Sequence, residues 1–475
     1  MSLRVWFAIA AFALMLHARG AAAAPPAEPP TDPPLPSGEK RPVPDYDGRG
    51  DEPTRPGDVL LWIPRIVLSP LYLVSEYVVR RPLGWAVSEA EKNQVPQKLV
   101  DLFTFGPENN IAVVPTGLVD FGFRPSVGVY FRWNDFLARD NKLRARAATG
   151  GVDWWLFTLA DRVEVAPDQE LGLRAEYSIR PDWVFHGLGP ESGEDEARFK
   201  MRKAEVGFRY DAELWRSSAA SSFVGVRDVS FDPSTGAFDD PTVGREIARG
   251  RYPAPPGLDD GYTVFVQGLS LELDTRPRRM PDDLPEGSDY VSPPGSGVRL
   301  QLRGEHAAGL RDAPGPGPER QHWLKYGGTL AGFVDLTGQQ RVLGLSLIAD
   351  FAEPLSAGSE IPFTEQVSLG GPRPLQGFLE GRLVGRSDAV AQLDYQYPIW
   401  VWLDGALHYA VGNVFGDDLE GFELELLRQS FGMGVRSTGN RDHAFELLVA
   451  FGTETFRSGG EIEHVRLVVG ATSGF

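Results

Sequence analysis

"GGPRPLQGFLEGRLVGRSDAVAQLDYQYPIW", residues 370–400, is the stretch that decides the fold. Its first half is punctuated by glycine and proline, which disfavour a regular element. From Asp388 onward apolar residues (Ala389, Ala391, Leu393, Tyr395, Tyr397) alternate with polar ones (Asp388, Gln392, Asp394, Gln396). This period of two predicts a strand with one apolar and one polar face, fed by a long irregular loop. The apolar face meets a second sheet in a sandwich, or lipid in an outer-membrane barrel.

Composition narrows the class of protein. The chain has 475 residues, no cysteine and a formal net charge of −18. The absence of cysteine excludes disulfides, thiolate metal sites, a lipoprotein anchor and cysteine nucleophiles. The negative charge, without a cluster of Lys and Arg, argues against nucleic acid as a partner.

The N-terminal region is expected to precede the folded part of the chain. Residues 1–23 have a basic residue, an apolar run and small residues suited to cleavage, which predicts a secretory signal peptide. Residues 24–57 are rich in proline and charge and predict an extended linker. Residues 58–106 are apolar but broken by prolines and arginines. They predict short helical pieces at the membrane surface or barrel mouth, with a small packing domain as the alternative.

Alternating segments occupy the rest of the chain, residues 107–475. One phase of residues 127–133 is Val127, Val129, Phe131 and Trp133, and the same pattern recurs at 171–179, 204–210 and 298–302. We expect sixteen strands, the even number that a closed barrel with both ends on one side requires. The expected strands are 110–118, 125–133, 141–149, 153–162, 168–180, 199–213, 217–228, 261–274, 296–308, 322–335, 341–352, 385–398, 402–413, 428–437, 442–454 and 463–474.

The connections and the C-terminus agree with a barrel. If the first strand rises from the periplasm, the long connections 181–198, 229–260 and 353–384 lie outside, and only 275–295 is a long connection on the periplasmic side. The last strand places Val465, Leu467, Val469 and the terminal Phe475 in one phase. An ordinary edge strand would leave backbone groups unpaired there, whereas closure of the ring pairs them.

The order of several motifs resembles the BamA/TamA superfamily of outer-membrane proteins, the bacterial surface antigen family. The motifs are Gly370-Gly371, the tip Leu375-Gln376-Gly377-Phe378, "GRLVGRSDAV" (381–390), "YPIW" (397–400), "VGNVF" (411–415), "LDTR" (273–276) and "FHGLGPES" (185–192). The resemblance implies a sixteen-stranded outer-membrane barrel, over residues 107–475, whose loop after the eleventh strand folds into the lumen.

Two departures qualify the resemblance. The arginine of the family's loop tip is replaced by Gln376, and its aspartate partner aligns with Ala410, in phase with the lumenal Gly412. Losing one partner of a buried pair costs about 3–5 kcal/mol, whereas losing both can be near neutral. We therefore expect the loop to dock through hydrogen bonds of Gln376 and packing of Phe378, with Arg373 or Arg382 as possible substitutes for the charge. Moreover, no POTRA domain fits upstream of the barrel.

No catalytic motif, metal-ligand spacing or cofactor fingerprint is present, so we expect neither an enzyme nor a bound cofactor. The resemblance implies a Gram-negative outer-membrane protein that assists insertion or translocation of proteins or lipids. The rival expectation is a passive structural or pore-forming barrel. Expected partners are outer-membrane lipid, lipopolysaccharide, client outer-membrane proteins and the machinery that inserts the barrel itself.

Overall fold

The structure is a computed structural model of the chain. It describes residues 102–106, 109–277, 295–311, 321–356, 359–372, 374–400, 403–437 and 444–472. The expected signal peptide (1–23), the linker (24–57), nearly all of the helical segment (58–106) and the terminal Phe475 lie outside the described residues.

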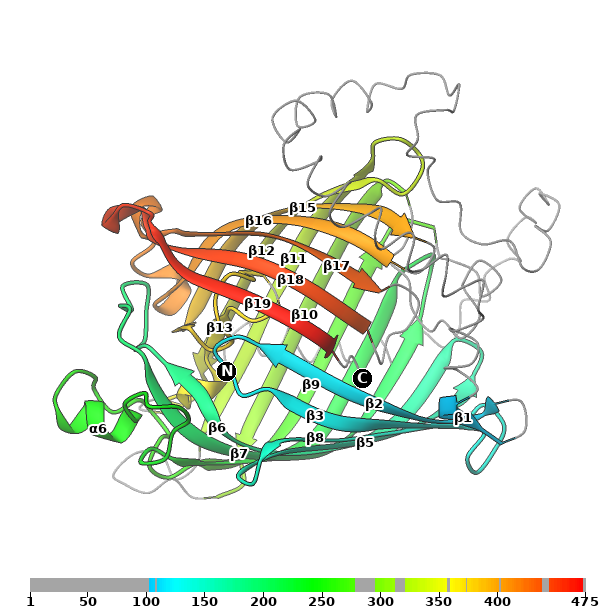
Figure 1. The fold of residues 1–475 in the computed structure, drawn as a ribbon, viewed down its shortest axis with the longest axis horizontal. Helices are drawn as coiled ribbons and strands as arrows, with labels where there is room; N and C mark the ends of the chain where they lie inside the picture. The colour runs from blue at the N-terminus through cyan, green and yellow to red at the C-terminus, as the bar shows by residue number, and fades with distance from the viewer. Residues whose placement is uncertain are drawn as a thin grey trace. The chain divides into compact units, whose positions relative to one another are not determined.

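Sixteen antiparallel strands form the wall of the barrel (Figure 1). Their bounds are β2 (Ile111–Asp120), β3 (Ser126–Asn134), β4 (Lys142–Gly151), β5 (Trp154–Ala166), β6 (Gln169–Phe185), β7 (Ala197–Glu213), β8 (Ala219–Asp232), β9 (Tyr262–Asp274), β10 (Gly297–Gly309), β11 (His322–Asp335), β12 (Val342–Pro354), β15 (Ser387–Trp400), β16 (Leu403–Phe415), β17 (Arg428–Ser437), β18 (Ala444–Thr455) and β19 (Ile462–Thr472). The predicted number of strands is confirmed, with ends that differ by a few residues.

Pairing follows the order of the chain, and β19 pairs with β2 to close the ring. The short strand β1 (Thr104–Phe105) pairs with the start of β2. A separate two-stranded sheet, β13 (Val367–Leu369) with β14 (Leu383–Gly385), lies within the connection between β12 and β15. The closed ring confirms the expected barrel and excludes the sandwich.

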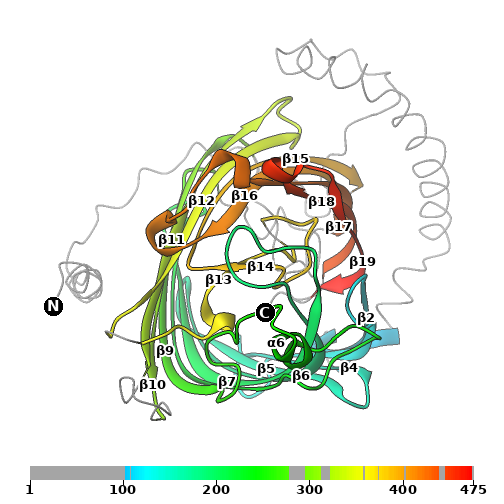
Figure 2. The same ribbon diagram turned by 90° about the vertical axis from the view of Figure 1, so that its left-hand side faces the viewer.

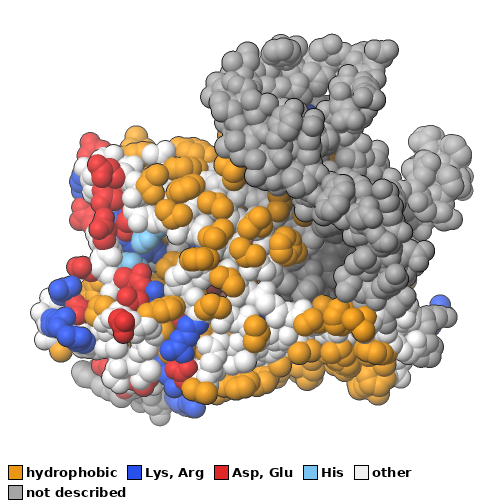
Figure 3. Space-filling view, viewed as in Figure 1, with side chains coloured by type: hydrophobic (Ala, Val, Ile, Leu, Met, Phe, Trp, Pro, Cys, Tyr) orange, Lys and Arg blue, Asp and Glu red, His pale blue; other side chains and the backbone are white. Residues whose placement is uncertain are grey.

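The predicted division of faces also holds. On β3, Val127 is 67% exposed on the outer face, whereas Tyr130 is 4% exposed on the lumenal face. Exposed apolar side chains recur in the outer phase of other strands, for example Phe208, Leu302 and Leu347. Figure 3 shows hydrophobic side chains spread over the strands, with many acidic side chains at one end of the barrel. Such a surface suits hydrocarbon rather than water.

The longest described connections lie at one end of the barrel, here called the loop end. They follow β6 (186–196), β8 (233–261) and β12 (355–386), as the antiparallel order requires. The second of them carries the short helix α6 (Val243–Ala248). Viewed along the barrel, β13 and β14 lie inside the ring of strands (Figure 2). None of the helices among the described residues is long and apolar enough to cross a membrane.

Leu302→Arg tests the assignment of the outer face. Leu302 is half exposed in the middle of β10, so a guanidinium there would enter hydrocarbon and destabilise the barrel by about 2–4 kcal/mol. The control is Gln301→Arg on the same strand, which faces the lumen opposite Glu272 and is expected to be nearly neutral. Denaturant unfolding in phospholipid vesicles measures both free energies. Equal effects would contradict the assignment.

Candidate functional site: the lumenal loop and the strand seam

The connection between β12 and β15 enters the lumen as a hairpin. Its base is the β13–β14 pair, in which Val367 lies opposite Gly385. At its turn Gly370 has φ +107°, and a Cβ there would lie 2.2 Å from the Leu379 oxygen. The Gly371 N–H donates to the Phe378 oxygen at 2.8 Å. Glycine is therefore required at position 370 by both its backbone angle and the lack of space.

The loop tip docks on a row of small residues of the wall. Ala410, Ser430 and Gly452 lie side by side on β16, β17 and β18. The Gly377 N–H donates to the Ser430 hydroxyl at 2.8 Å, and a Cβ on Gly377 would lie 2.1 Å from the Phe451 backbone. The tip thus rests almost directly on the strand backbone, which larger side chains would prevent.

Apolar packing holds the same tip. Leu375 and Phe378 are fully buried, in a cluster with Leu369, Leu383, Val390, Ala410 and Val414. The Phe378 ring also meets the His464 ring edge-on, with centroids 5.6 Å apart. Ala410, for which the sequence suggested a place near the tip, is fully buried in this cluster and contributes packing only.

A second part of the loop binds the other side of the lumen. Glu365, in the 3-10 turn Phe363–Glu365, accepts hydrogen bonds from Arg227 of β8 at 2.9 Å, Lys325 of β11 at 2.8 Å and Tyr262 of β9 at 2.7 Å. Burial alone would raise the pKa of Glu365, but the charges of Lys325 and Arg227 outweigh it and hold the pKa at about 2.

Beside Glu365, the Phe363 ring packs against three rings of the β6–β8 wall. Its centroid lies 5.6 Å from that of Phe185, 5.3 Å from that of Phe199 and 5.2 Å from that of Phe231. Aromatic pairs at such distances add stability beyond the area they bury. The loop is therefore anchored to two separate walls.

Two arginines carry the charges near the tip. Arg382, from the loop itself, is fully buried and donates to the carboxylate of Glu463 and to His464 Nε2 at 3.0 Å. Arg428 of β17 donates to the other Glu463 oxygen at 2.6 Å. Arg382 thus supplies a charge near the tip, as one of the two predicted substitutes. The other, Arg373, lies outside the described residues.

Glu463 reaches the lumen because of a β-bulge. Strict alternation places Glu463 in the outer phase with Val465. Its neighbours Ile462 and His464 pair with Thr453 and Gly452, so one extra residue is inserted in β19. A bulge re-aims a side chain locally. As a result the Glu463 carboxylate points inward and is only 3% exposed.

The connection 186–196 covers this ion cluster from the loop end. Ser192 accepts from Arg382 through its hydroxyl at 3.0 Å and from Arg428 through its backbone oxygen at 2.7 Å. The Gly189 N–H donates to the Val384 oxygen at 2.8 Å. Burial and the nearby charge of Arg382 lower the pKa of His186 well below its ordinary value, so its ring adds no further positive charge. The "FHGLGPES" motif therefore lies over the lumenal loop.

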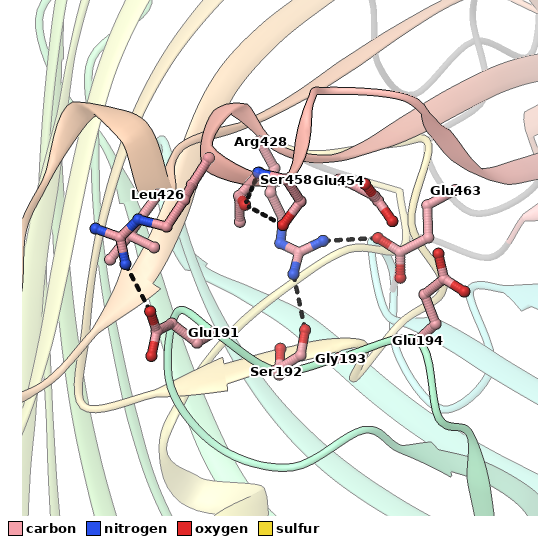
Figure 4. A pocket seen from close by; sticks show the side chains of 11 residues that line it. Glu191, Ser192, Gly193, Glu194, Leu426, Arg428, Glu454, Ser458 and Glu463 are labelled. Carbon is pink, nitrogen blue, oxygen red and sulfur yellow. Dashed lines mark hydrogen bonds and ion pairs between the residues drawn. The ribbon is translucent and has the colours of Figure 1, made fainter.

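A small cleft lies between this connection and the ends of β17–β19 (Figure 4). Its volume is about 230 Å³. Its charged lining residues are Glu191, Glu194, Arg428, Glu454, Arg457 and Glu463. Among the described residues, no group of His, Asp and Glu side chains is arranged to hold a metal ion.

Among the described residues, the closing pair of strands has the fewest paired positions in the ring. β19 and β2 share three there, Val468–Asp120, Val469–Val119 and Gly470–Leu118, whereas every other neighbouring pair of barrel strands shares at least eight. A Cβ on Gly470 would lie 2.2 Å from the Gly117 oxygen. Below this point β2 contains Pro115, which has no N–H to donate. We call this short contact the seam.

A third arginine joins the seam to the loop. Arg466 of β19 donates from Nε and Nη2 to both carboxylate oxygens of Asp120 on β2, at 2.9 and 2.7 Å. Its Nη1 donates to the Gly371 oxygen at 2.7 Å and the Gln376 oxygen at 3.2 Å. The sequence suggested that Gln376 helps to dock the loop through hydrogen bonds. The hydrogen bond from Arg466 is accepted by the backbone oxygen of Gln376.

Sequence reasoning placed the tip, Arg382, Ala410 and Gly412 in one region, and the structure brings them together. It missed Arg466, Asp120, Glu463 and Glu365. Arg466 is a charged residue in the lumenal phase of the last strand, between apolar residues, and this was a usable signal. Val465, Leu467 and Val469 share the outer phase of β19, as expected.

The chain matches no protein-family model and no curated protein. Among solved structures it is similar to BamA from Haemophilus ducreyi lacking POTRA domains 1–3, with 14% identity and a TM-score of 0.51, over 76% of this chain and 70% of that chain. It also matches CdiB from Acinetobacter baumannii (9% identity, TM-score 0.46, 76% and 59% covered) and CdiB from Escherichia coli (10%, 0.46, 77% and 64%). The likeness to BamA concerns the fold, and it confirms the barrel that the family resemblance implies.

Phe378→Ala is expected to destabilise the barrel by about 3–5 kcal/mol, because it empties a fully buried aromatic position. Gln376→Ala is expected to change stability little, since the backbone oxygen that accepts from Arg466 is kept. Denaturant unfolding of the detergent-solubilised barrel measures both, with Phe422→Ala at a half-exposed ring as the control. A large loss in Gln376→Ala would show that its side chain holds the loop.

Glu365→Gln is expected to lower stability at neutral pH by about 1–3 kcal/mol, because Arg227 and Lys325 lose one carboxylate and keep their ion pairs with Glu305. The pKa of Glu365 is depressed by folding, so its contribution is present above about pH 4.5 and is lost as pH falls toward 2. The gap between wild type and variant should therefore narrow over this range in unfolding measurements. Glu425→Gln, at an exposed carboxylate, is the control and should show no such trend. A gap that does not depend on pH would be evidence against the ion network.

Proposed function

We propose that the protein resides in the bacterial outer membrane and assists insertion or translocation of proteins or lipids there, through opening of the β2–β19 seam. The single observation that carries this proposal is the seam itself, which has three paired positions in the described part of a ring whose other neighbouring strands share eight or more. Among the described residues, β1 pairs with Ile111 and Ala112 and β19 pairs with residues 118–120, so residues 113–117 of β2 have no paired position on β19. A strand edge with few partners accepts another strand readily.

Three further features support the same proposal. The fold is that of the BamA barrel, the outer face is apolar, and the hairpin loop is held inside the lumen. On this proposal the protein reaches the membrane after cleavage of a signal peptide. Its partners are outer-membrane lipid, lipopolysaccharide and client barrels, and the barrel-assembly machinery inserts it. It acts without a covalent step or a cofactor.

The contacts of the loop inside the lumen give less support to a passive pore. The loop is anchored both on the β16–β19 wall and on the β8–β11 wall, and the connection 186–196 lies over it. These contacts occupy the loop end, where a conducting channel would need free space. The remaining alternative is a passive structural barrel, and the following experiment separates it from the proposal.

Val119→Cys/Val469→Cys places a disulfide across the seam, at directly paired positions. Because the chain has no cysteine of its own, this is its only possible disulfide. The full-length protein is reconstituted into vesicles. One assay follows folding of an unfolded eight-stranded barrel, and another follows transfer of a fluorescent phospholipid between leaflets. We expect oxidation to slow at least one of these at least tenfold, and reduction to restore it.

The control pair, Met433→Cys/Val449→Cys, links β17 to β18, which are already fully paired. It should leave both rates unchanged. If the locked seam transfers both probes as fast as the reduced form, the insertion proposal fails and the passive structural barrel is favoured.

A further inference from the structure

The loop tip contacts both sides of the seam from the lumen. On the β19 side, Phe378 packs against His464 and fits against Gly452. On the β2 side, Leu379 packs with Phe123, in the turn that follows β2. The same turn is tight at Gly122, where a Cβ would lie 2.7 Å from the Leu379 side chain. One short segment of loop therefore spans two strands that have little direct pairing.

Arg466 lies where these contacts converge. Its guanidinium makes a two-point bond to Asp120, across the seam, and donates from Nη1 to the loop oxygens of Gly371 and Gln376. The Arg466 side chain is 6% exposed and that of Asp120 is 13% exposed. A buried guanidinium needs all of these acceptors, because an unsatisfied charged donor away from water is costly.

We propose that Arg466 couples release of the loop tip to opening of the seam. The tip then cannot leave its dock without weakening the seam, and the seam cannot open without loosening the tip. This inference rests on the proposed function only because that function makes the seam the place where the barrel opens. The coupling itself is a property of the folded protein. Opening of the seam removes Asp120 from Arg466, and the freed guanidinium then turns toward other acceptors. Departure of the tip removes two acceptors from the same group.

The test makes one substitution in the seam and measures its effect on the loop tip, and makes another in the loop and measures its effect on the seam. Asp120→Asn touches the seam but no loop atom bonded to Arg466, and Phe378→Ala touches the loop but not β2. The loop reporter is a single cysteine, Gln376→Cys, at a buried position, and its rate of maleimide labelling reports release of the tip. The seam reporter is the rate of disulfide formation in Val119→Cys/Val469→Cys.

We expect Asp120→Asn to raise labelling at position 376 at least fivefold, and Phe378→Ala to slow seam disulfide formation at least fivefold. Leu375→Val is the milder loop variant, in case Phe378→Ala does not fold, because its buried cluster includes residues of β15 and β16 and none of β2 or β19. Asp350→Asn is the matched control, because it removes a similar two-point bond, to Arg303, on the β10–β12 wall. It should change neither rate. Heat-modifiable migration in gels verifies that each variant is folded.

The coupling is overturned if each variant affects only its own reporter, or if Asp350→Asn reproduces both effects through general loosening of the barrel. These measurements use the isolated protein and no client. Normal coupling together with unchanged transfer in the locked seam would therefore contradict only the proposed function. Loss of transfer in the locked seam without coupling would contradict only this inference.

Discussion

The whole structure depends on pairing the backbone groups of every strand around a closed ring. In hydrocarbon an unpaired N–H or C=O costs several kcal/mol, so a sheet with a free edge is not stable there. Fifteen of the sixteen strand junctions meet this requirement with eight or more residue pairs, and the junction of β19 with β2 has three residue pairs in the part of the chain that the structure describes. Backbone pairing at that junction is short, and side chains on the lumenal face add contacts that join the two strands.

A ring of sixteen strands encloses more space than the side chains of its own inner face fill. The loop after β12 fills part of that space and packs its apolar residues against apolar and small side chains of the inner wall. The tip buries Leu375 and Phe378 against small wall residues. Arg466 of the wall strand β19 donates to backbone oxygens of the tip, so the charge lies on the wall and its acceptors lie on the loop.

The barrel was predictable because the alternation of apolar and polar residues is a local property that is present in nearly every strand. The lengths of the connections agreed, since all but one of the long ones fall on the same side of the expected barrel. The side-chain contacts were harder to predict, since they depend on which strands become neighbours across the lumen. Glu463 is the clearest case, because a one-residue bulge reverses the face that alternation assigns to it. Glu365 and its partners come from segments far apart in the chain, and no spacing in the sequence relates them. Gln376 was correctly placed, but its bonding atom belongs to the backbone, which residue type does not reveal.

The anchoring of one loop to two facing walls also has a mechanical meaning. Glu365 ties it to β8, β9 and β11, and Gly377 ties it to β17. A cylinder of strands on its own deforms easily from a circular to an oval section when the surrounding bilayer exerts lateral pressure. A strut fixed at both ends resists that flattening, so changes in membrane tension would be transmitted along the loop as strain rather than absorbed by the wall.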